Sequence, residues 1–244
     1  MTMYRKLFER LFPNFIKRII DPVTYKIDTF VISVVNESGT GNLVLDAGAG
    51  ECRFKSCLKN KTYVAIDAAW GDSTWNYSQL DAVGALDRLP FTSDVFDCVI
   101  CTQVLEHVRE PQLVLNELFR ALKQGGLICL TAPQGWGVHQ APHDYFRFTN
   151  LALRYLLEKA GFENLSITPS CGYFSYLANR LTLFPKQLFW HIKRRWLRIT
   201  VFPVELLSYF FFVLAFPLLL NAMDFLDRDR NYTLNYFVKG RKPK

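Results

Sequence analysis

Residues 43–51, Leu-Val-Leu-Asp-Ala-Gly-Ala-Gly-Glu, constrain the fold of this chain more than any other stretch. The apolar run at 43–45 is short and bounded by polar and glycine residues, which is typical of a buried strand. Asp46 ends the run, and Gly48 and Gly50 follow it. Glycine lets a backbone approach a ligand where a Cβ would clash. The sequence therefore predicts a nucleotide-like cofactor at the end of the first core strand.

Strand and helix patterns alternate beyond this point. Short apolar runs predict strands at 42–46, 62–67, 95–101, 127–132, 165–168 and 232–239. Helices are expected at 51–59, at 111–123, and at 151–160 with Thr149 or Asn150 as N-cap and Gly161 as its stop. Because the strands are almost continuously apolar, the expected fold is α/β: a Rossmann-like doubly wound sheet, mostly parallel and covered on both faces.

Charge is unevenly placed along the 244 residues. The chain has a net charge of +7, whereas residues 41–160 carry 13 acids and 11 bases and are net negative. The basic surplus thus lies in the flanking segments. This favours binding of these segments to an anionic surface, either a membrane or a nucleic acid; the alternative is that the charge only keeps the protein soluble. Cys98 and Cys101 form a CxxC within a predicted strand, so they point to opposite faces. Scattered thiols and the lack of a signal-peptide pattern in residues 1–20 predict a cytoplasmic protein.

The acids near the glycine loop discriminate between cofactors. The loop reads D-x-G-x-G, whereas a dinucleotide site usually shows G-x-G-x-x-G. Asp67 ends the next predicted strand, where an acid can bind ribose hydroxyls. Two acids are poor neighbours for a pyrophosphate but suit a ligand with an amino group and a sulfonium. This favours S-adenosylmethionine (SAM) over the nicotinamide cofactor of a reductase.

A set of motifs in this order resembles the class I SAM-dependent methyltransferases, in particular the methyltransferase type 11 group. The matching pieces are VLDAGAGE (44–51), YVAID (63–67), LPF (89–91), FDCVICTQVLEHV (96–108), LKQGGLICLTAP (122–133) and HDYFRFT (143–149). They cover roughly residues 40–165. The resemblance implies the fold, SAM as cofactor, and an antiparallel last strand at 232–239.

The resemblance also implies a set of cofactor contacts. The matching positions are Asp46, Gly48, Gly50, Asp67, Ala68, Leu86, Thr102, Gln103 and His107. The first three match the loop under the methionine part, Asp67 the ribose acid, Leu86 the adenine side, and Thr102 and Gln103 the sulfonium. His107 is expected either to close this pocket or to cap local structure. Two positions depart from the pattern: Cys52 replaces a third glycine, and Ala85 replaces an acid beside adenine, with Asp81 or Asp87 as substitutes.

Methyl transfer to oxygen or nitrogen needs a group that removes a proton. Histidine suits this role because its ordinary pKa lies near neutrality. His139 or His143 is the expected general base, because both lie in the loop after the strand at 127–132. Asp144, Tyr145 and Arg147 are expected to orient the substrate; in the alternative interpretation this segment only caps and pins the next helix. Pro142 opposes a zinc site of the His-x-x-x-His type, so no metal is expected.

Two segments point to a membrane surface. Residues 4–20, within an N-terminal segment 1–40, have the pattern of a basic amphipathic helix. Such a helix is expected either to lie on an anionic membrane or to pack on the domain. Residues 172–231 interrupt the SAM-binding domain, which comprises 41–171 and 232–244, and they include the uncharged run 206–223. Since the chain returns to the same sheet, a single membrane span is excluded. We expect a helical hairpin on or in the bilayer; a soluble cap over the pocket and a dimer interface are the alternatives.

The acceptor follows from these segments. Residues 101–104, Cys-Thr-Gln-Val, lack the Asn/Asp-Pro-Pro-aromatic motif that amino-methylating nucleic-acid enzymes share, so nucleic acid is a disfavoured partner. We expect a peripheral methyltransferase on the inner face of the membrane. Its acceptor would be an amphipathic or lipid-linked small molecule, such as a glycan-lipid or a quinone-like compound. The alternative is a non-catalytic, SAM-binding partner protein at the membrane, which Ala85 favours.

Overall fold

The structure is a computed structural model that describes residues 22–39, 41–72, 74–189, 191 and 195–244. The predicted helix at 4–20 lies outside these residues. Two compact units are present. One contains the described residues up to Thr168 together with Asn235–Lys244, and the other is Pro169–Leu234.

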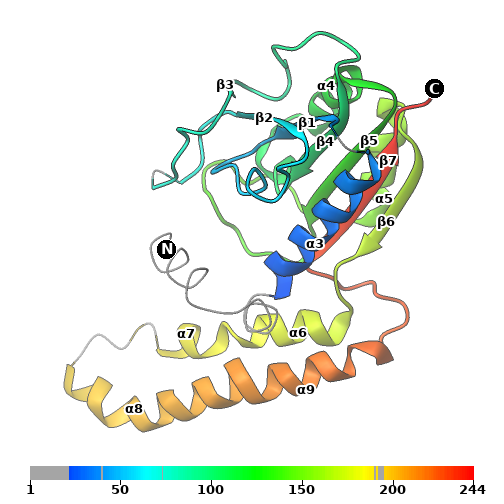
Figure 1. The fold of residues 1–244 in the computed structure, drawn as a ribbon. Coiled ribbons are helices and arrows are strands. Elements are labelled where there is room, and N and C mark those ends of the chain that lie inside the picture. The colour runs from blue at the N-terminus through cyan, green and yellow to red at the C-terminus, as the bar shows by residue number, and fades with distance from the viewer. Residues whose placement is uncertain (1–21, 40, 73, 190, 192–194) are drawn as a thin grey trace. The chain divides into compact units, whose positions relative to one another are not determined.

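The first unit is built on a seven-stranded sheet of order β3-β2-β1-β4-β5-β7-β6 (Figure 1). Its strands are β1 (Leu43–Ala47), β2 (Thr62–Asp67), β3 (Ala82–Val83), β4 (Phe96–Thr102), β5 (Leu122–Pro133), β6 (Glu163–Pro169) and β7 (Asn235–Arg241). Strands β3, β2, β1, β4 and β5 pair in parallel, and β7 pairs with β5 in the antiparallel sense. This confirms the Rossmann-like fold with an antiparallel last strand.

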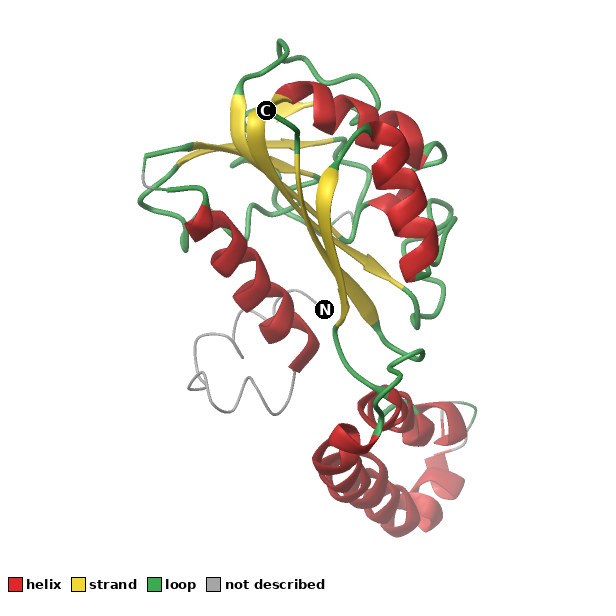
Figure 2. Ribbon diagram, turned by 90° about the vertical axis from the view of Figure 1, so that its right-hand side faces the viewer, coloured by secondary structure: helices red, strands yellow, loops and turns green. Residues whose placement is uncertain are grey.

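Helices cover both faces of this sheet (Figures 1 and 2). On one face α3 (Pro22–Glu37) packs through Ile27 and Val31 into a cluster that includes Cys98. On the other, α4 (Pro111–Ala121) and α5 (Asn150–Ala160) pack into a larger cluster that includes Cys101. The two cysteines therefore lie on opposite faces, as strand alternation predicts.

Local signals set several helix ends. The Thr149 side chain accepts a hydrogen bond from the Ala152 N–H at 3.1 Å and caps α5. Gly161 ends that helix with φ +100°, and an added Cβ would lie 2.9 Å from Cζ of Phe119. A glycine is therefore needed there for conformation as well as for space.

The predicted helix at 51–59 is wrong, because the chain forms successive turns there. Cys52 has φ +55°, a left-handed conformation that breaks a right-handed helix. The hydrogen bonds that follow are mostly of the i to i+3 type, such as Lys55 N–H to Cys52 O at 3.1 Å. The short strand β3 and the helix α3 were not predicted. Other differences are at boundaries: α4 ends at Ala121 rather than 123, β5 begins at Leu122 rather than 127, and β7 begins at Asn235 rather than 232.

The second unit is a helical hairpin (Figure 1). One arm holds α6 (Tyr173–Leu181) and α7 (Phe184–Phe189). The other holds α8 (Arg195–Tyr209), the π-helical segment η2 (Phe210–Ala215), α9 (Phe216–Met223) and the 3-10 turn η3 (Asp224–Leu226). The insertion before the last strand is therefore helical, as expected. The second arm continues through both Pro203 and Pro217 without a break.

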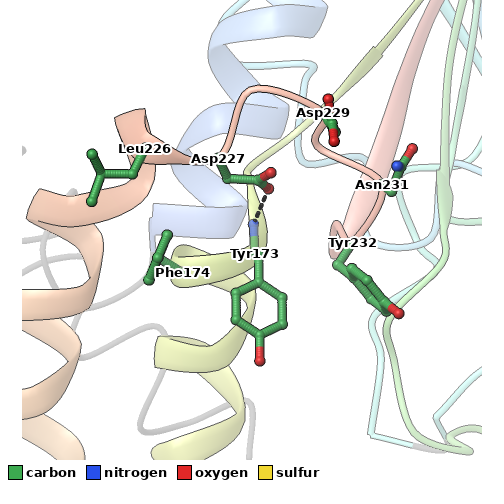
Figure 3. A pocket seen from close by; sticks show the side chains of 7 residues that line it. All are labelled: Tyr173, Phe174, Leu226, Asp227, Asp229, Asn231 and Tyr232. Atoms are coloured by element: carbon green, nitrogen blue, oxygen red, sulfur yellow. Dashed lines mark hydrogen bonds between the residues drawn. The ribbon is translucent and has the colours of Figure 1, made fainter.

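The base of this hairpin is fixed by two carboxylates. Asp224 accepts hydrogen bonds from the Gly172 and Ser175 N–H groups at 2.9 and 2.8 Å. Asp227 accepts one from the Tyr173 N–H at 2.6 Å, which Figure 3 shows as a dashed line. These bonds satisfy the free N–H groups at the start of α6. A small hollow beside them is lined by Tyr173, Phe174, Leu226, Asp227, Asp229, Asn231 and Tyr232 (Figure 3).

Candidate active site

The carboxyl ends of the three neighbouring parallel strands β2, β1 and β4 meet at one edge of the sheet. Asp46 in β1 is in register with Ala65 of β2 and with Ile100 of β4, so Asp46, Asp67 and Thr102 close neighbouring strands. The loops after these strands therefore converge at the edge where parallel α/β sheets bind ligands.

The glycine loop after β1 follows a path that only glycine allows. Gly48 has φ +83°, and an added Cβ would lie 2.3 Å from Cγ2 of Val104. The N–H groups of Gly48 and Ala49 both donate to the Ile66 carbonyl, at 2.8 and 3.1 Å. The loop is thus held against β2, and the lack of a Cβ at Gly48 lets Val104 pack directly on its backbone.

Asp67 ties the two neighbouring loops together. Its Oδ2 accepts from the Gly50 N–H at 2.9 Å and its Oδ1 accepts from the Ala69 N–H at 2.7 Å. A carboxylate has about four acceptor positions, so both oxygens can still accept from ribose hydroxyls. This arrangement fits the predicted ribose contact.

Asp46 is a buried acid with an unsatisfied oxygen. It is 1% exposed, and the Tyr63 hydroxyl donates to its Oδ2. Its Oδ1 has no hydrogen-bond partner among the described atoms. Burial raises the pKa of Asp46 to about 7, against lowering by the Tyr63 hydrogen bond and the Arg53 charge. A cationic amino group of a ligand would satisfy this oxygen, so the donor set fits SAM.

The remaining cofactor positions lie on the same set of strands and loops. Leu86 is buried at 6% exposed. Gln103, with φ +55°, binds Thr131 of β5 through its backbone N–H and its side-chain amide, at 2.9 and 3.0 Å. Ala68 follows Asp67 directly in the chain. The suggested replacements for the acid at Ala85, Asp81 and Asp87, are both exposed, and Asp81 accepts a hydrogen bond from the Ala65 N–H at 2.8 Å.

An ion pair pins the loop after β5. Asp144 and Arg147 form two parallel hydrogen bonds of 2.7 Å, and the Asp144 side chain is 2% exposed. The guanidinium also donates to the carbonyls of Gly137 and Trp136, each at 2.8 Å. Arg147 lowers the pKa of Asp144 to about 2. Both side chains therefore fix the loop backbone, including His139, whose N–H donates to Asp144 at 2.8 Å.

The other predicted residues of this loop lie beside the segment after β4. His143 Nδ1 is 3.1 Å from the Tyr145 hydroxyl, and Arg109 Nε donates to that hydroxyl at 3.2 Å. His107, in the 3-10 turn η1 (Leu105–His107), has its Nδ1 2.5 Å from the His143 carbonyl. The rings of His107 and His139 lie 4.8 Å apart. The structure therefore brings three predicted histidines into one cluster.

Sequence reasoning missed one residue of this cluster. Glu106 is fully buried, and burial raises its pKa to about 8. Its carbonyl accepts from the N–H groups of Tyr145 and Phe146, so its backbone anchors the loop. The available signal was an acid directly after the apolar pair Val104-Leu105.

Known proteins resemble this chain over the same region. Residues 45–130 match a family model described as a methyltransferase domain. A demethylmenaquinone methyltransferase of Bacillus licheniformis is 33% identical over 117 residues, which are 45% of this chain and 49% of that protein. A probable S-adenosylmethionine-dependent methyltransferase of Mycolicibacterium smegmatis is 28% identical over 135 residues, 50% of this chain and 52% of its own length.

This chain carries a class I SAM-dependent methyltransferase domain. It spans about half the length of the curated relatives it matches. Solved structures share the fold: a SAM-dependent methyltransferase of Archaeoglobus fulgidus has a TM-score of 0.56 at 13% identity, covering 93% of this chain and 98% of its own. Haemonchus contortus phosphoethanolamine N-methyltransferase 2, solved with SAM, has a TM-score of 0.54 at 15% identity, covering 87% of this chain and 52% of its own.

The methyltransferase glycine loop gives a first prediction. We expect Gly48→Ala to lower the free energy of unfolding by about 2 kcal/mol or more, because the Cβ clashes with Val104 and the positive φ is strained. We also expect SAM affinity to fall at least about tenfold. Gly137→Ala is the matched control, since nothing lies within 4 Å of its added Cβ. Urea unfolding and calorimetric SAM titration measure both effects; equal behaviour of the two variants would contradict the assignment.

The buried carboxyl of Asp46 gives a second prediction. The native state holds this proton up to about pH 7, whereas the ordinary pKa of 3.8 applies to the exposed carboxyl of the unfolded chain. The unfolding free energy therefore falls as the pH rises through that window. Asp46→Asn should remove this part of the slope and leave the ligand-free variant more stable than wild type above pH 7. It should also weaken SAM binding. Denaturation at pH 5 and 8 tests this, with the exposed Asp87→Asn as control; a variant less stable than wild type at pH 8 would refute it.

Proposed function

We propose that this protein transfers a methyl group from SAM to an amphipathic or lipid-linked small molecule, such as a glycan-lipid or a quinone-like compound. The observation that carries the acceptor class is the helical hairpin of the second unit. Among the described residues, the helix Thr200–Leu226 is long and apolar enough to cross a membrane, and none of its apolar window is buried. Length and composition alone are weak evidence for a span.

The exposed surface of this helix is chemically suited to lipid. Large apolar side chains point to solvent all along it: Phe202, Leu206, Leu207, Phe210, Phe211, Leu214, Leu218 and Leu219. Contiguous apolar surface of this extent is rare on soluble monomers and marks an interaction site. Burial of one such side chain is worth about 1.5–3 kcal/mol, so lipid contact would be strongly favourable.

The sequence of the hairpin adds an electrostatic argument. The sequence here contains the basic residues Lys193, Arg194, Arg195 and Arg198, of which the last two belong to α8. Each Lys or Arg near an anionic leaflet contributes about 1 kcal/mol. Both ends of the hairpin return to strands of one sheet, β6 and β7, so a surface or shallow position in the bilayer is proposed rather than a single crossing. The name of the Bacillus licheniformis relative, a quinone methyltransferase, agrees with a lipid-like acceptor.

We assign cofactor binding, proton removal and loop positioning to different residues at the sheet edge. Asp46, the glycine loop and Asp67 bind and orient SAM, which supplies the activated methyl group. His143 is the proposed general base: its Nδ1–H donates to the Tyr145 hydroxyl oxygen, 3.1 Å away, so its Nε2 keeps the lone pair that takes a proton from the acceptor. Tyr145, held by Arg109, orients that ring. Asp144 and Arg147 keep the loop in place, so we propose them as positioning residues.

Methyl transfer is tested with isotopically labelled SAM and a cell lipid extract. Wild type should move labelled methyl into the organic phase, and Asp67→Ala should lose at least about tenfold, because both loops and the ribose contact depend on that carboxylate. Glu163→Ala, at an exposed acid of β6, serves as the control. Label found only in water-soluble products would contradict the lipid acceptor. SAM binding without any incorporation would favour the non-catalytic membrane-associated protein.

Membrane association has its own test. Wild type should co-sediment with vesicles containing anionic lipid, and the double variant Leu206→Glu, Leu219→Glu should bind at least about tenfold more weakly, because two carboxylates would enter the apolar phase. Leu151→Glu is the control, since Leu151 is at least as exposed as Leu206 and Leu219 but lies on α5 of the other unit. Unchanged sedimentation of the double variant would show that the hairpin does not contact lipid.

A further inference from the structure

Three polar atoms near the edge of the sheet are buried without a hydrogen-bond partner among the described atoms. They are both carboxylate oxygens of Glu106 and the Nε2 atom of His107. Glu106 is 0% exposed, so water does not reach it. A buried acid without partners is costly, and such groups in native proteins usually have a function or an absent ligand.

These atoms converge with a second histidine. One donor atom each from Glu106, His107 and His139 lie within 4.8 Å of one another. His107 Nε2 is 3.8 Å from Oε1 of Glu106, and the rings of His107 and His139 meet edge to face at 81°. Two imidazoles and one carboxylate thus face a common point.

The contacts of the Nδ1 atom of each histidine bear on which ring nitrogen is free to bind a metal ion. His107 Nδ1 contacts the His143 carbonyl at 2.5 Å, and His139 Nδ1 contacts the Gly137 carbonyl at 3.1 Å. The His143 carbonyl only accepts, so His107 Nδ1 carries the proton and His107 Nε2 keeps its lone pair. His139 Nδ1 also lies 3.4 Å from Asp144 Oδ2, which accepts, and 3.4 Å from Nη2 of Arg147, which donates. When this Nδ1 carries the proton, His139 Nε2 is the metal-binding atom. Metal-ligating histidines almost always have such a partner on the second nitrogen, which fixes the tautomer and the ring orientation.

The loop that carries His139 is also fixed in place. The backbone N–H of His139 donates to Asp144, and the Arg147 guanidinium donates to the Gly137 carbonyl of the same loop. Because Asp144 and Arg147 neutralise each other through two hydrogen bonds, the positive charge of Arg147 is largely compensated beside Glu106. The carboxylate of Glu106 is then the one negative ligand that a cation would meet in this three-residue set.

We propose that Glu106, His107 and His139 bind one divalent transition-metal ion of the zinc class. Two imidazole nitrogens and one carboxylate are the donor set of known catalytic zinc sites, and three protein ligands leave a coordination position open. Tetrahedral bonds of about 2.1 Å require donor atoms about 3.4 Å apart, so the side chains would close by about 1 Å. The zinc pattern His139-x-x-x-His143 is not needed, since the second histidine comes from η1. The site does not depend on the proposed methyl transfer.

Metal binding to the full-length chain, without a histidine tag, tests this proposal. Zn²⁺ is titrated calorimetrically, and Co²⁺ is used as an optical probe because its visible absorption reports coordination geometry. We expect one equivalent per chain with a dissociation constant in the micromolar range or tighter. Glu106→Gln, His107→Gln and His139→Asn should each weaken binding by at least about tenfold.

His143→Asn is the matched control, because it removes a neighbouring imidazole but keeps the backbone carbonyl that holds His107. It should bind Zn²⁺ as wild type does. His139→Asn is the decisive variant. The His139 side chain is 38% exposed, so the variant should fold, which circular dichroism and SAM titration verify. No stoichiometric binding to wild type would overturn the proposal. So would a folded His139→Asn that keeps full affinity, or an equal loss in His143→Asn.

Discussion

The carboxylate of Asp67 joins the loops that follow β1 and β2, and the cofactor edge depends on that connection. One of its oxygens holds the Gly50 N–H and the other holds the Ala69 N–H. These two bonds keep the glycine loop near the end of β2, where its backbone and Asp46 face the same region. The close packing of Gly48 against Val104 then links this loop to the segment after β4. The loops of three strands are thereby organised around one side chain.

A second, separate network organises the other half of the edge. The Asp144–Arg147 pair fixes the loop after β5, and the backbone of Glu106 holds Tyr145 and Phe146. His107, His139 and His143 are brought together by these contacts. The burial of Glu106 and Asp46 is unfavourable for ionised carboxylates, and burial raises the pKa of both groups. Buried acids of this kind at a sheet edge are typical of functional sites rather than of stabilising core.

Much of this arrangement could be predicted from the sequence. The core strands are continuous apolar runs with glycine or polar ends, so β1, β2 and β4 were placed to within one residue. The loop after β1 was predicted as a helix because no local signal shows that Cys52 adopts a left-handed conformation. The contact of Tyr63 with Asp46 and the grouping of Glu106 with two histidines depend on strand register and loop folding. Spacing along the chain does not reveal such contacts.

The account depends on SAM, rather than a nicotinamide dinucleotide, being the ligand of this edge. Asp46 and Asp67 at neighbouring strand ends disfavour a pyrophosphate and favour a cationic amino acid moiety. The most direct measurement is a pair of calorimetric titrations of the purified full-length chain, one with SAM and one with NADH. The account predicts one SAM bound per chain and no heat from NADH at the same concentrations. Saturable NADH binding in the absence of SAM binding would contradict it.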